Sequence, residues 1–342
     1  MKKIKLLLVL VISFIICGCG KKGVNDVIKS FEKKVNSVKS YSITGLMEIT
    51  SNEETYSYDV FVDYKYEDYY KVTLVNKIND HEQIILKNDD GVYVVTPALN
   101  KSFKFQSEWP LNSSQSYLLK SLVNDIKNTE DPKVEKKDEY FVVTADVDYP
   151  NNKTLVNEKI YFDKKNNLKE VHVLNSDGNT VIKMKFNNIK YSVKFDDNNF
   201  SLDSLISNTC DEEGACKEIT TNSSISENVV YPLYVPADTH LSTKDTIETD
   251  NGDRIVMTYA GSKPFMLIEE MVSASKEMEV TSIYGDPLIL SNAIGALSSN
   301  SLEWQSNNVQ YYITSSYLTS EEMLTIAESL SAAQVIEVMN SK

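Results

Sequence analysis

The feature that most constrains the fold is the alternation of residue types in "YSYDVFVDYKY", residues 56–66. Tyrosine or valine stands at every second position, mostly with polar or charged residues between them. These positions are Tyr56, Tyr58, Val60, Val62, Tyr64 and Tyr66. Because successive side chains of a β-strand point to opposite faces, this repeat predicts a half-buried antiparallel strand. The chain is therefore expected to build a sheet that has one face on a hydrophobic core.

Strand signals continue on both sides of this segment, and turn residues separate them. Asp90 and Gly91 stand between two apolar runs, which predicts a tight β-hairpin. Further strands are predicted over residues 140–148, 158–163, 169–175, 181–186 and 191–195. The charged segment 129–139 is predicted to be a solvated loop. Many strands at regular spacing indicate a large curved antiparallel sheet.

Three segments carry the three- and four-residue spacing of apolar residues that predicts amphipathic helices. They are residues 24–38, residues 113–126 and a segment that follows Thr319. In the last of these, Glu322 stands three residues after Thr319, a spacing that predicts a capping box. The predicted inner face of this helix consists of Met323, Ile326, Ala327 and Leu330.

The predicted elements fall into two domains. Residues 207–228 contain almost no large apolar side chain, so we predict a linker there. Residues 24–206 before the linker form the predicted sheet domain, and residues 229–342 form a small α+β domain. Its predicted strands are "VVYPLYVP", "RIVMTYA", "FMLIEEMV", residues 302–305 and residues 309–314. The predicted fold class is α+β throughout.

The first residues predict that the protein is exported from the cytoplasm. Three lysines precede an apolar run over residues 6–16, as in a secretory signal peptide, predicted here over residues 1–18. The sequence Ile16-Cys17-Gly18-Cys19 is similar to a bacterial lipobox, which makes Cys19 the predicted diacylated residue and residues 19–23 a tether. The alternative is a plain secretory signal with an incidental cysteine.

Two further cysteines, Cys210 and Cys216, enclose a short acidic loop in "TCDEEGAC". Outside the cytoplasm, two cysteines at this spacing indicate a local disulfide. A two-thiol metal site is the alternative, although no histidine stands nearby.

Charge excludes one class of partner. The formal net charge is −14, and removal of Lys2, Lys3 and Lys5 with the signal peptide would change it to −17. A nucleic-acid-binding protein needs a basic surface, so no nucleic-acid partner is expected.

No catalytic or metal-binding pattern stands out. His81, His172 and His240 are far apart in the sequence, and neither a Gly-x-Ser-x-Gly motif nor a phosphate-binding glycine loop is present. We therefore expect no enzymatic activity, no cofactor and no metal. A hydrolase whose site is assembled from scattered residues is the weakest alternative.

Tyrosine is abundant, with 20 residues in all and six of them between residues 56 and 70. One interpretation is that tyrosine simply favours strands. The other is an amphipathic concave wall that binds an amphiphile or a partner segment, since tyrosine combines an apolar ring with a polar tip. Both interpretations remain open here.

Several motifs resemble the LolA/LolB lipoprotein-carrier superfamily over residues 24–203. The segment "KNDDGVYVVTPALNKSFKF" joins the Asp90-Gly91 hairpin to Tyr93 and to the turn at residues 97–100. Later matches are Asp177-Gly178, "FNNI" at residues 186–189 and the closing element from Asp197 to Phe200. The two-domain layout is similar to RseB-like and GerS-like lipoproteins, the latter found in Gram-positive spore formers.

The resemblance implies an unclosed half-barrel with a helical lid over a hydrophobic cavity. In the carriers this cavity holds the acyl chains of a lipoprotein. We therefore expect a lipid-anchored protein on the outer face of the cell membrane that binds a lipid or a lipoprotein acyl chain. Its candidate cavity wall consists of Tyr56, Tyr58, Val60, Val62, Tyr64 and Tyr66. The alternative is a scaffold or sensor that binds a protein of the cell-envelope or spore-cortex and germination machinery.

Overall fold

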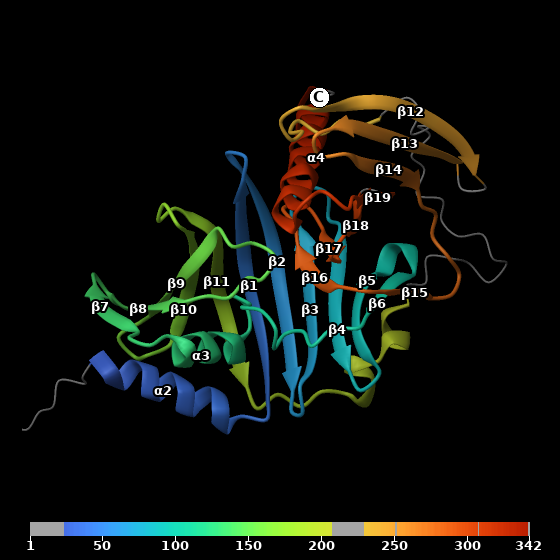
Figure 1. The fold of residues 1–342 in the computed structure, drawn as a ribbon. Helices are drawn as coiled ribbons and strands as arrows, with labels where there is room; N and C mark the ends of the chain where they lie inside the picture. Colours follow the sequence, from blue (N-terminus) through green and yellow to red (C-terminus); the bar gives the residue numbers. More distant parts are fainter. Residues whose placement is uncertain (1–23, 207–228, 250–251, 307, 341–342) are drawn as a thin grey trace, which may run out of the picture.

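The computed structural model describes residues 24–206, 229–249, 252–306 and 308–340, which form two sheets and three α-helices (Figure 1). The predicted signal peptide, Cys19, the tether and the Cys210–Cys216 loop lie outside these residues, as does the proposed linker. None of the described helices is long and apolar enough to cross a membrane.

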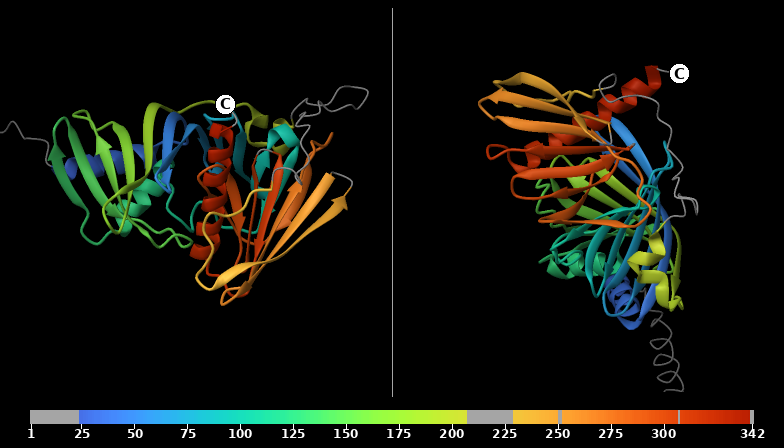
Figure 2. Two further views of the ribbon diagram at one scale, coloured as in Figure 1. Left: turned by 90° about the horizontal axis from the view of Figure 1, so that it is seen from above. Right: turned by 90° about the vertical axis from the view of Figure 1, so that its right-hand side faces the viewer.

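The larger sheet has twelve strands and is strongly curved, as the view from above in Figure 2 shows. Its spatial order is β15-β6-β5-β4-β3-β2-β1-β11-β10-β9-β8-β7. The bounds of the eleven strands from the N-terminal half are β1 Ser40–Ser51, β2 Glu54–Lys65, β3 Tyr69–Asn76, β4 Glu82–Asn88, β5 Gly91–Thr96, β6 Lys101–Phe105, β7 Lys133–Lys137, β8 Tyr140–Asp146, β9 Leu155–Phe162, β10 Leu168–Asn175 and β11 Thr180–Tyr191. The predicted antiparallel curved sheet is confirmed, including the hairpin at Asp90-Gly91 between β4 and β5.

Two helices cover one half of the concave face of this sheet. They are α2, Val24–Ser37, and α3, Leu119–Asn128, and they lie side by side in front of β7–β9 (Figure 1). Helix α2 buries Val27, Phe31 and Val35, and the Phe31 ring lies 5.1 Å from the Phe162 ring of β9. The apolar spacing of both helices thus places one face of each on the core, as predicted.

Three short 3-10 helices occur outside the concave face: η1 Pro97–Leu99, η2 Asp197–Phe200 and η3 Leu202–Leu205. Phe200 from η2 packs with Ile84, Leu86, Tyr93 and Val95 in a separate small cluster. Because Ile84 and Leu86 alternate with Ile85 of the main core, this cluster covers the opposite face of β4 and β5.

The C-terminal half forms a seven-stranded antiparallel sheet in the order β12-β13-β14-β19-β18-β17-β16, with α4 packed against it. The bounds are β12 Thr239–Thr249, β13 Gly252–Gly261, β14 Phe265–Met271, β16 Asp286–Ile289, β17 Ile294–Leu297, β18 Ser301–Ser306, β19 Val309–Thr314 and α4 Ser320–Asn340. The capping box is confirmed: the Glu322 amide donates to Thr319 Oγ1 (3.2 Å), and the Thr319 amide donates to Glu322 Oε2 (3.0 Å). The predicted inner face of α4 is buried.

The two halves share strands and core. Strand β15, Glu279–Ile283, comes from the C-terminal half but pairs in parallel with β6 of the larger sheet. Ile294 and Ala296 of β17 belong to the same buried cluster as the concave face of β2 and β3. The C-terminal half therefore covers part of the concave face beside α2 and α3.

Two buried hydrogen bonds join the halves directly. The Tyr58 hydroxyl of β2 donates to the carbonyl oxygen of Ser291 (2.5 Å), and the Ile294 amide donates to Gln83 Oε1 of β4 (2.6 Å). An unpaired polar group at a buried junction costs free energy, so these contacts fix the position at which the halves meet.

Four local predictions are wrong. The helix predicted over residues 113–126 begins only at Leu119, and residues 113–118 form a loop. Segment 129–139 contains strand β7, whose charged residues stay solvated because β7 is an edge strand. The strand predicted at 181–186 continues to Tyr191 in β11, and no strand forms over residues 192–195, because β11 ends where Ser192 adopts a positive φ. The segment "VVYPLYVP" forms no strand, because Pro232 and Pro236 cannot donate ladder hydrogen bonds.

Two carboxyl groups are buried between α3 and β9. Glu158 is 0% exposed, and neither of its side-chain oxygens has a hydrogen-bond partner among the described residues. Burial raises the pKa of Glu158 far above its usual range, and the nearby Asp125 adds to this effect. Burial likewise raises the pKa of Asp125, whose Oδ1 accepts a hydrogen bond from Ser114 (2.9 Å). The pair therefore favours the protonated state in the folded chain.

Tyr58→Phe tests the junction between the halves. It leaves the Ser291 carbonyl without its partner, so we expect the free energy of unfolding to fall by about 1–3 kcal/mol. Tyr140→Phe is the matched control, because Tyr140 is exposed on β8. Urea denaturation measures both variants, and equal losses would contradict a specific role for the Tyr58 hydrogen bond.

Glu158→Gln tests the buried carboxyl pair. Above about pH 4.3 the unfolded chain releases the Glu158 proton while the folded chain keeps it, so stability falls as pH rises toward the raised folded pKa. Glutamine has no such proton. We therefore expect the unfolding free energy of the variant, relative to that of wild type, to increase by up to about 1.4 kcal/mol per pH unit in this range. Denaturation between pH 5 and 8 measures the slope. The exposed Glu135→Gln should leave the slope unchanged.

Candidate functional site

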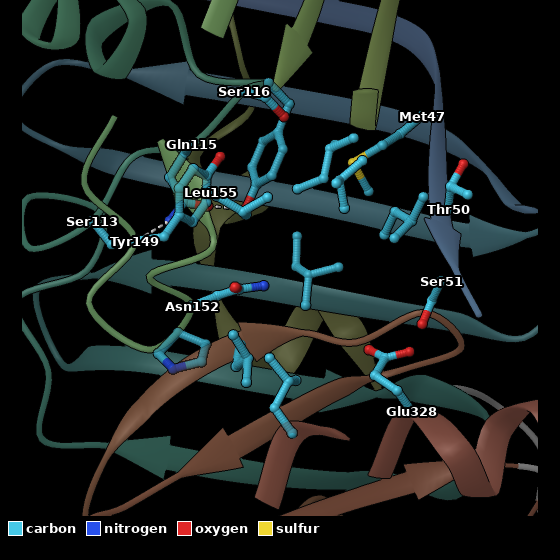
Figure 3. A pocket seen from close by; sticks show the side chains of 18 of the residues that line it. Met47, Thr50, Ser51, Ser113, Gln115, Ser116, Tyr149, Asn152, Leu155 and Glu328 are labelled. Atoms are coloured by element: carbon cyan, nitrogen blue, oxygen red, sulfur yellow. Dashed lines mark hydrogen bonds between the residues drawn. The ribbon is translucent and has the colours of Figure 1, made fainter. Parts of the chain in front are cut away.

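A mainly apolar cavity lies where the two halves meet, and its volume is about 140 Å³ (Figure 3). Its walls come from the ends of β1 and β11, from loops 113–117 and 149–155, and from β16 and α4. Most of the lining is apolar: Met47, Ile49, Ile85, Tyr117, Tyr149, Leu155, Val181, Ile182, Pro287, Leu288, Ile289 and Leu324. No single half of the chain forms this cavity.

One end of the cavity carries Glu328 of α4, whose carboxylate points toward Ser51 of β1 (Figure 3). Glu328 Oε1 accepts a hydrogen bond from the Ser291 amide (3.0 Å), and Oε2 accepts one from the Ser291 hydroxyl. Burial raises the pKa of Glu328, while the hydrogen bonds from Ser291 and Ser51 oppose this change. Glu328 is the only charged residue among those that line the cavity.

The other end is polar but uncharged, with Ser113, Gln115, Ser116 and Asn152 (Figure 3). A network of hydrogen bonds holds this end to α3. Ser114 Oγ donates to Asp125 and accepts from the Asp148 amide (2.8 Å), and the Gln115 amide donates to Ser121 Oγ (2.7 Å). The buried Asp125 therefore helps to fix the loop that forms this wall.

The candidate wall residues of β2 do not line this cavity. Tyr56, Tyr58, Val60, Val62 and Tyr64 are buried on the concave face, whereas Tyr66 is 54% exposed beyond the end of the strand. Their role in ligand binding stays a prediction.

Aromatic rings of the chain itself occupy the concave face beside β2. The Tyr64 ring stacks on Tyr41 at 4.7 Å between centroids and lies 5.0 Å from Tyr70. The Tyr70 ring in turn lies edge-on to Trp109 at 5.8 Å. All four side chains are buried. This part of the face is therefore packed with protein atoms.

Sequence reasoning did not identify Glu328 as a site residue. One signal was available: Glu328 stands four residues after Leu324, so both lie on the inner face of α4. A carboxyl group on the buried side of an amphipathic helix is unusual. The remaining lining residues come from segments scattered along the sequence, and no local pattern connects them.

The histidines are not brought together. His81 is an interior loop residue whose pKa is lowered by burial, His172 contacts Glu170 (2.9 Å), and His240 lies on β12. In the described part of the chain, no group of three or more His, Cys, Asp or Glu residues could hold a metal ion.

Several solved structures match this chain with low sequence identity and low TM-scores. A MucB crystal structure matches over 92% of this chain and 98% of its own, with 12% identity and a TM-score of 0.31. A LolA superfamily protein from Nitrosomonas europaea matches over 52% and 97%, with 10% identity and a TM-score of 0.31. A complex of the CwlD amidase from Clostridioides difficile with the GerS lipoprotein contains a chain that matches over 50% and 98%, with 18% identity and a TM-score of 0.23.

A full-length relative gives a more specific assignment. The sporulation protein YdcC of Bacillus subtilis (strain 168) is 35% identical over 338 residues, which cover 96% of this chain and 98% of the relative. The family model described as sporulation protein YdcC-like matches residues 1–200. The chain therefore belongs to the YdcC-like family of sporulation proteins.

Proposed function

We propose that this protein is a lipid-anchored, extracytoplasmic binding protein whose ligand is another protein of the cell envelope, and that it acts in sporulation. The proposal depends mainly on one observation: the concave face that would hold an acyl chain is filled by the chain's own aromatic rings, helices and C-terminal half. The function is binding, without catalysis.

The size of the cavity at the junction of the two halves favours a protein ligand over a lipid. Sites for drug-sized ligands usually have volumes of about 300–1,000 Å³, whereas a cavity of about 150 Å³ takes a molecule the size of benzene. The cavity here has about 140 Å³. That volume suits one side chain of a partner better than the acyl chains of a lipoprotein.

An exposed apolar rim beside the cavity supports a protein partner. Asp286 accepts hydrogen bonds from Ser107 (2.6 Å) and Asn112 (2.7 Å), which hold the loop after β6 against β16. In the sequence Leu111 directly precedes Asn112, and Tyr284 stands two residues before Asp286; the two side chains are 64% and 75% exposed. Large exposed apolar side chains next to a concavity are typical of interaction sites.

The proposed anchor suits this geometry. Cys19 precedes the first residue of α2 by five positions, which allows a span of at most about 17 Å. Helix α2 and the C-terminal end of α4 lie at opposite ends of the molecule (Figure 1). An anchor at Cys19 would therefore keep the α2 end near the membrane and direct the C-terminal half away from it.

Photo-crosslinking in sporulating cells tests the partner. With benzoylphenylalanine in place of Tyr284, we expect a crosslink to one envelope protein, because the side chain lies on the exposed rim. The same replacement at Tyr140, exposed on β8 away from the cavity, is the matched control. The crosslinked protein should then form a complex of fixed stoichiometry with the purified chain in native mass spectrometry.

Native mass spectrometry also tests the rival lipid function. A stoichiometric adduct of acyl-chain mass on the purified chain, together with identical crosslinks from positions 284 and 140, would overturn the proposal. A chain free of lipid that binds the crosslinked protein would support it.

A further inference from the structure

We infer that the cavity beside Glu328 receives a lysine side chain of the partner, with the ammonium group at Glu328 and the aliphatic stem along the apolar walls. The inference rests on the proposed function, since it names the chemistry by which the partner is recognised. It is carried by the size of the cavity, its single charge and the hydrogen bonds that Glu328 already makes.

The walls match a long aliphatic stem. Ile49, Ile182, Leu288 and Leu324 are among the apolar residues that line the same cavity as Glu328. Lysine buries its methylene groups along apolar surface while its charged end stays in a polar environment. A charged end without such a stem would leave these walls without contacts.

The charge of the cavity is uncompensated. No lysine or arginine lines it, and within the described residues Glu328 forms no ion pair. A half-buried carboxylate without a cation is costly, and a partner's ammonium group would offset that cost. The overall net charge of −14 would add a long-range attraction for a basic partner segment.

The hydrogen bonds of Glu328 favour lysine over arginine. A carboxylate has about four acceptor sites, and two hydrogen bonds from Ser291 and one from Ser51 leave about one free, which is too few for a two-point contact. Arginine binds carboxylates best through two parallel hydrogen bonds, whereas lysine presents a compact point charge that needs only one free acceptor site.

Titration with blocked amino acids tests the inference on the mature chain carrying Cys19→Ala. The probes are the Nα-acetyl methylamides of lysine, norleucine and arginine, and NMR chemical-shift changes of residues around the cavity give their dissociation constants. We expect the lysine probe to bind about tenfold more tightly than norleucine, which has the same stem without the charge, and more tightly than arginine. Equal binding of lysine and norleucine, or no binding of either, overturns the inference.

Two variants test whether the preference for lysine depends on Glu328. In Glu328→Gln we expect lysine and norleucine to bind equally, because the carboxylate is gone while the apolar walls remain. Glu321→Gln, exposed on the first turn of α4, should keep the preference for lysine. A lysine preference that survives in Glu328→Gln would also overturn the inference. Should Glu328→Gln fail to fold, the comparison of the three probes on the unsubstituted cavity still decides.

The test separates this inference from the proposed function. If a partner is crosslinked from position 284 but the lysine probe has no advantage, the inference fails while protein binding stands. If the lysine probe binds as expected but the chain carries a stoichiometric lipid and no partner, the site chemistry is supported and the proposed function fails.

Discussion

The apolar concave face of the twelve-stranded sheet must be removed from water along its whole width, because a sheet this curved gathers its largest apolar side chains on one side. Helices α2 and α3 pack mainly over β7–β9. Trp109, from the segment before α3, packs against Tyr70, and Ile294 and Ala296 of β17 join the same core from the C-terminal half, which also adds β15 to the edge of the sheet. The hydrogen bonds Tyr58–Ser291 and Ile294–Gln83 hold the C-terminal half in place.

The cavity is a consequence of this closure. It remains where β1, β11, loops 113–117 and 149–155, β16 and α4 meet without filling the space between them. When the halves pack together, Glu328 lies at one end of the cavity, held by Ser291. At the other end, the buried Asp125 accepts a hydrogen bond from Ser114 and so fixes the loop that forms the wall. Stability and the geometry of the site therefore depend on the same contacts.

The relation between fold and function follows from what occupies the concave face. The resemblance to lipoprotein carriers implies a cavity for acyl chains behind the tyrosines of β2. In this protein those tyrosines contact neighbouring rings and the C-terminal half, as Tyr64 and Tyr58 show. The proposed function accordingly moves from the concave face to the junction between the halves, where a small cavity and an exposed apolar rim remain.

The sequence by itself determined the local elements. The two-residue repeat of β2, the Asp90-Gly91 hairpin, the amphipathic α2 and the Thr319–Glu322 capping box each depend on residues close together in the chain, and local geometry is sufficient to specify them. Only the tertiary structure decided that residues 279–283 pair with residues 101–105, and that Glu328 lies across a cavity from Asn152. Contacts between segments more than a hundred residues apart depend on packing, for which a sequence pattern gives no register.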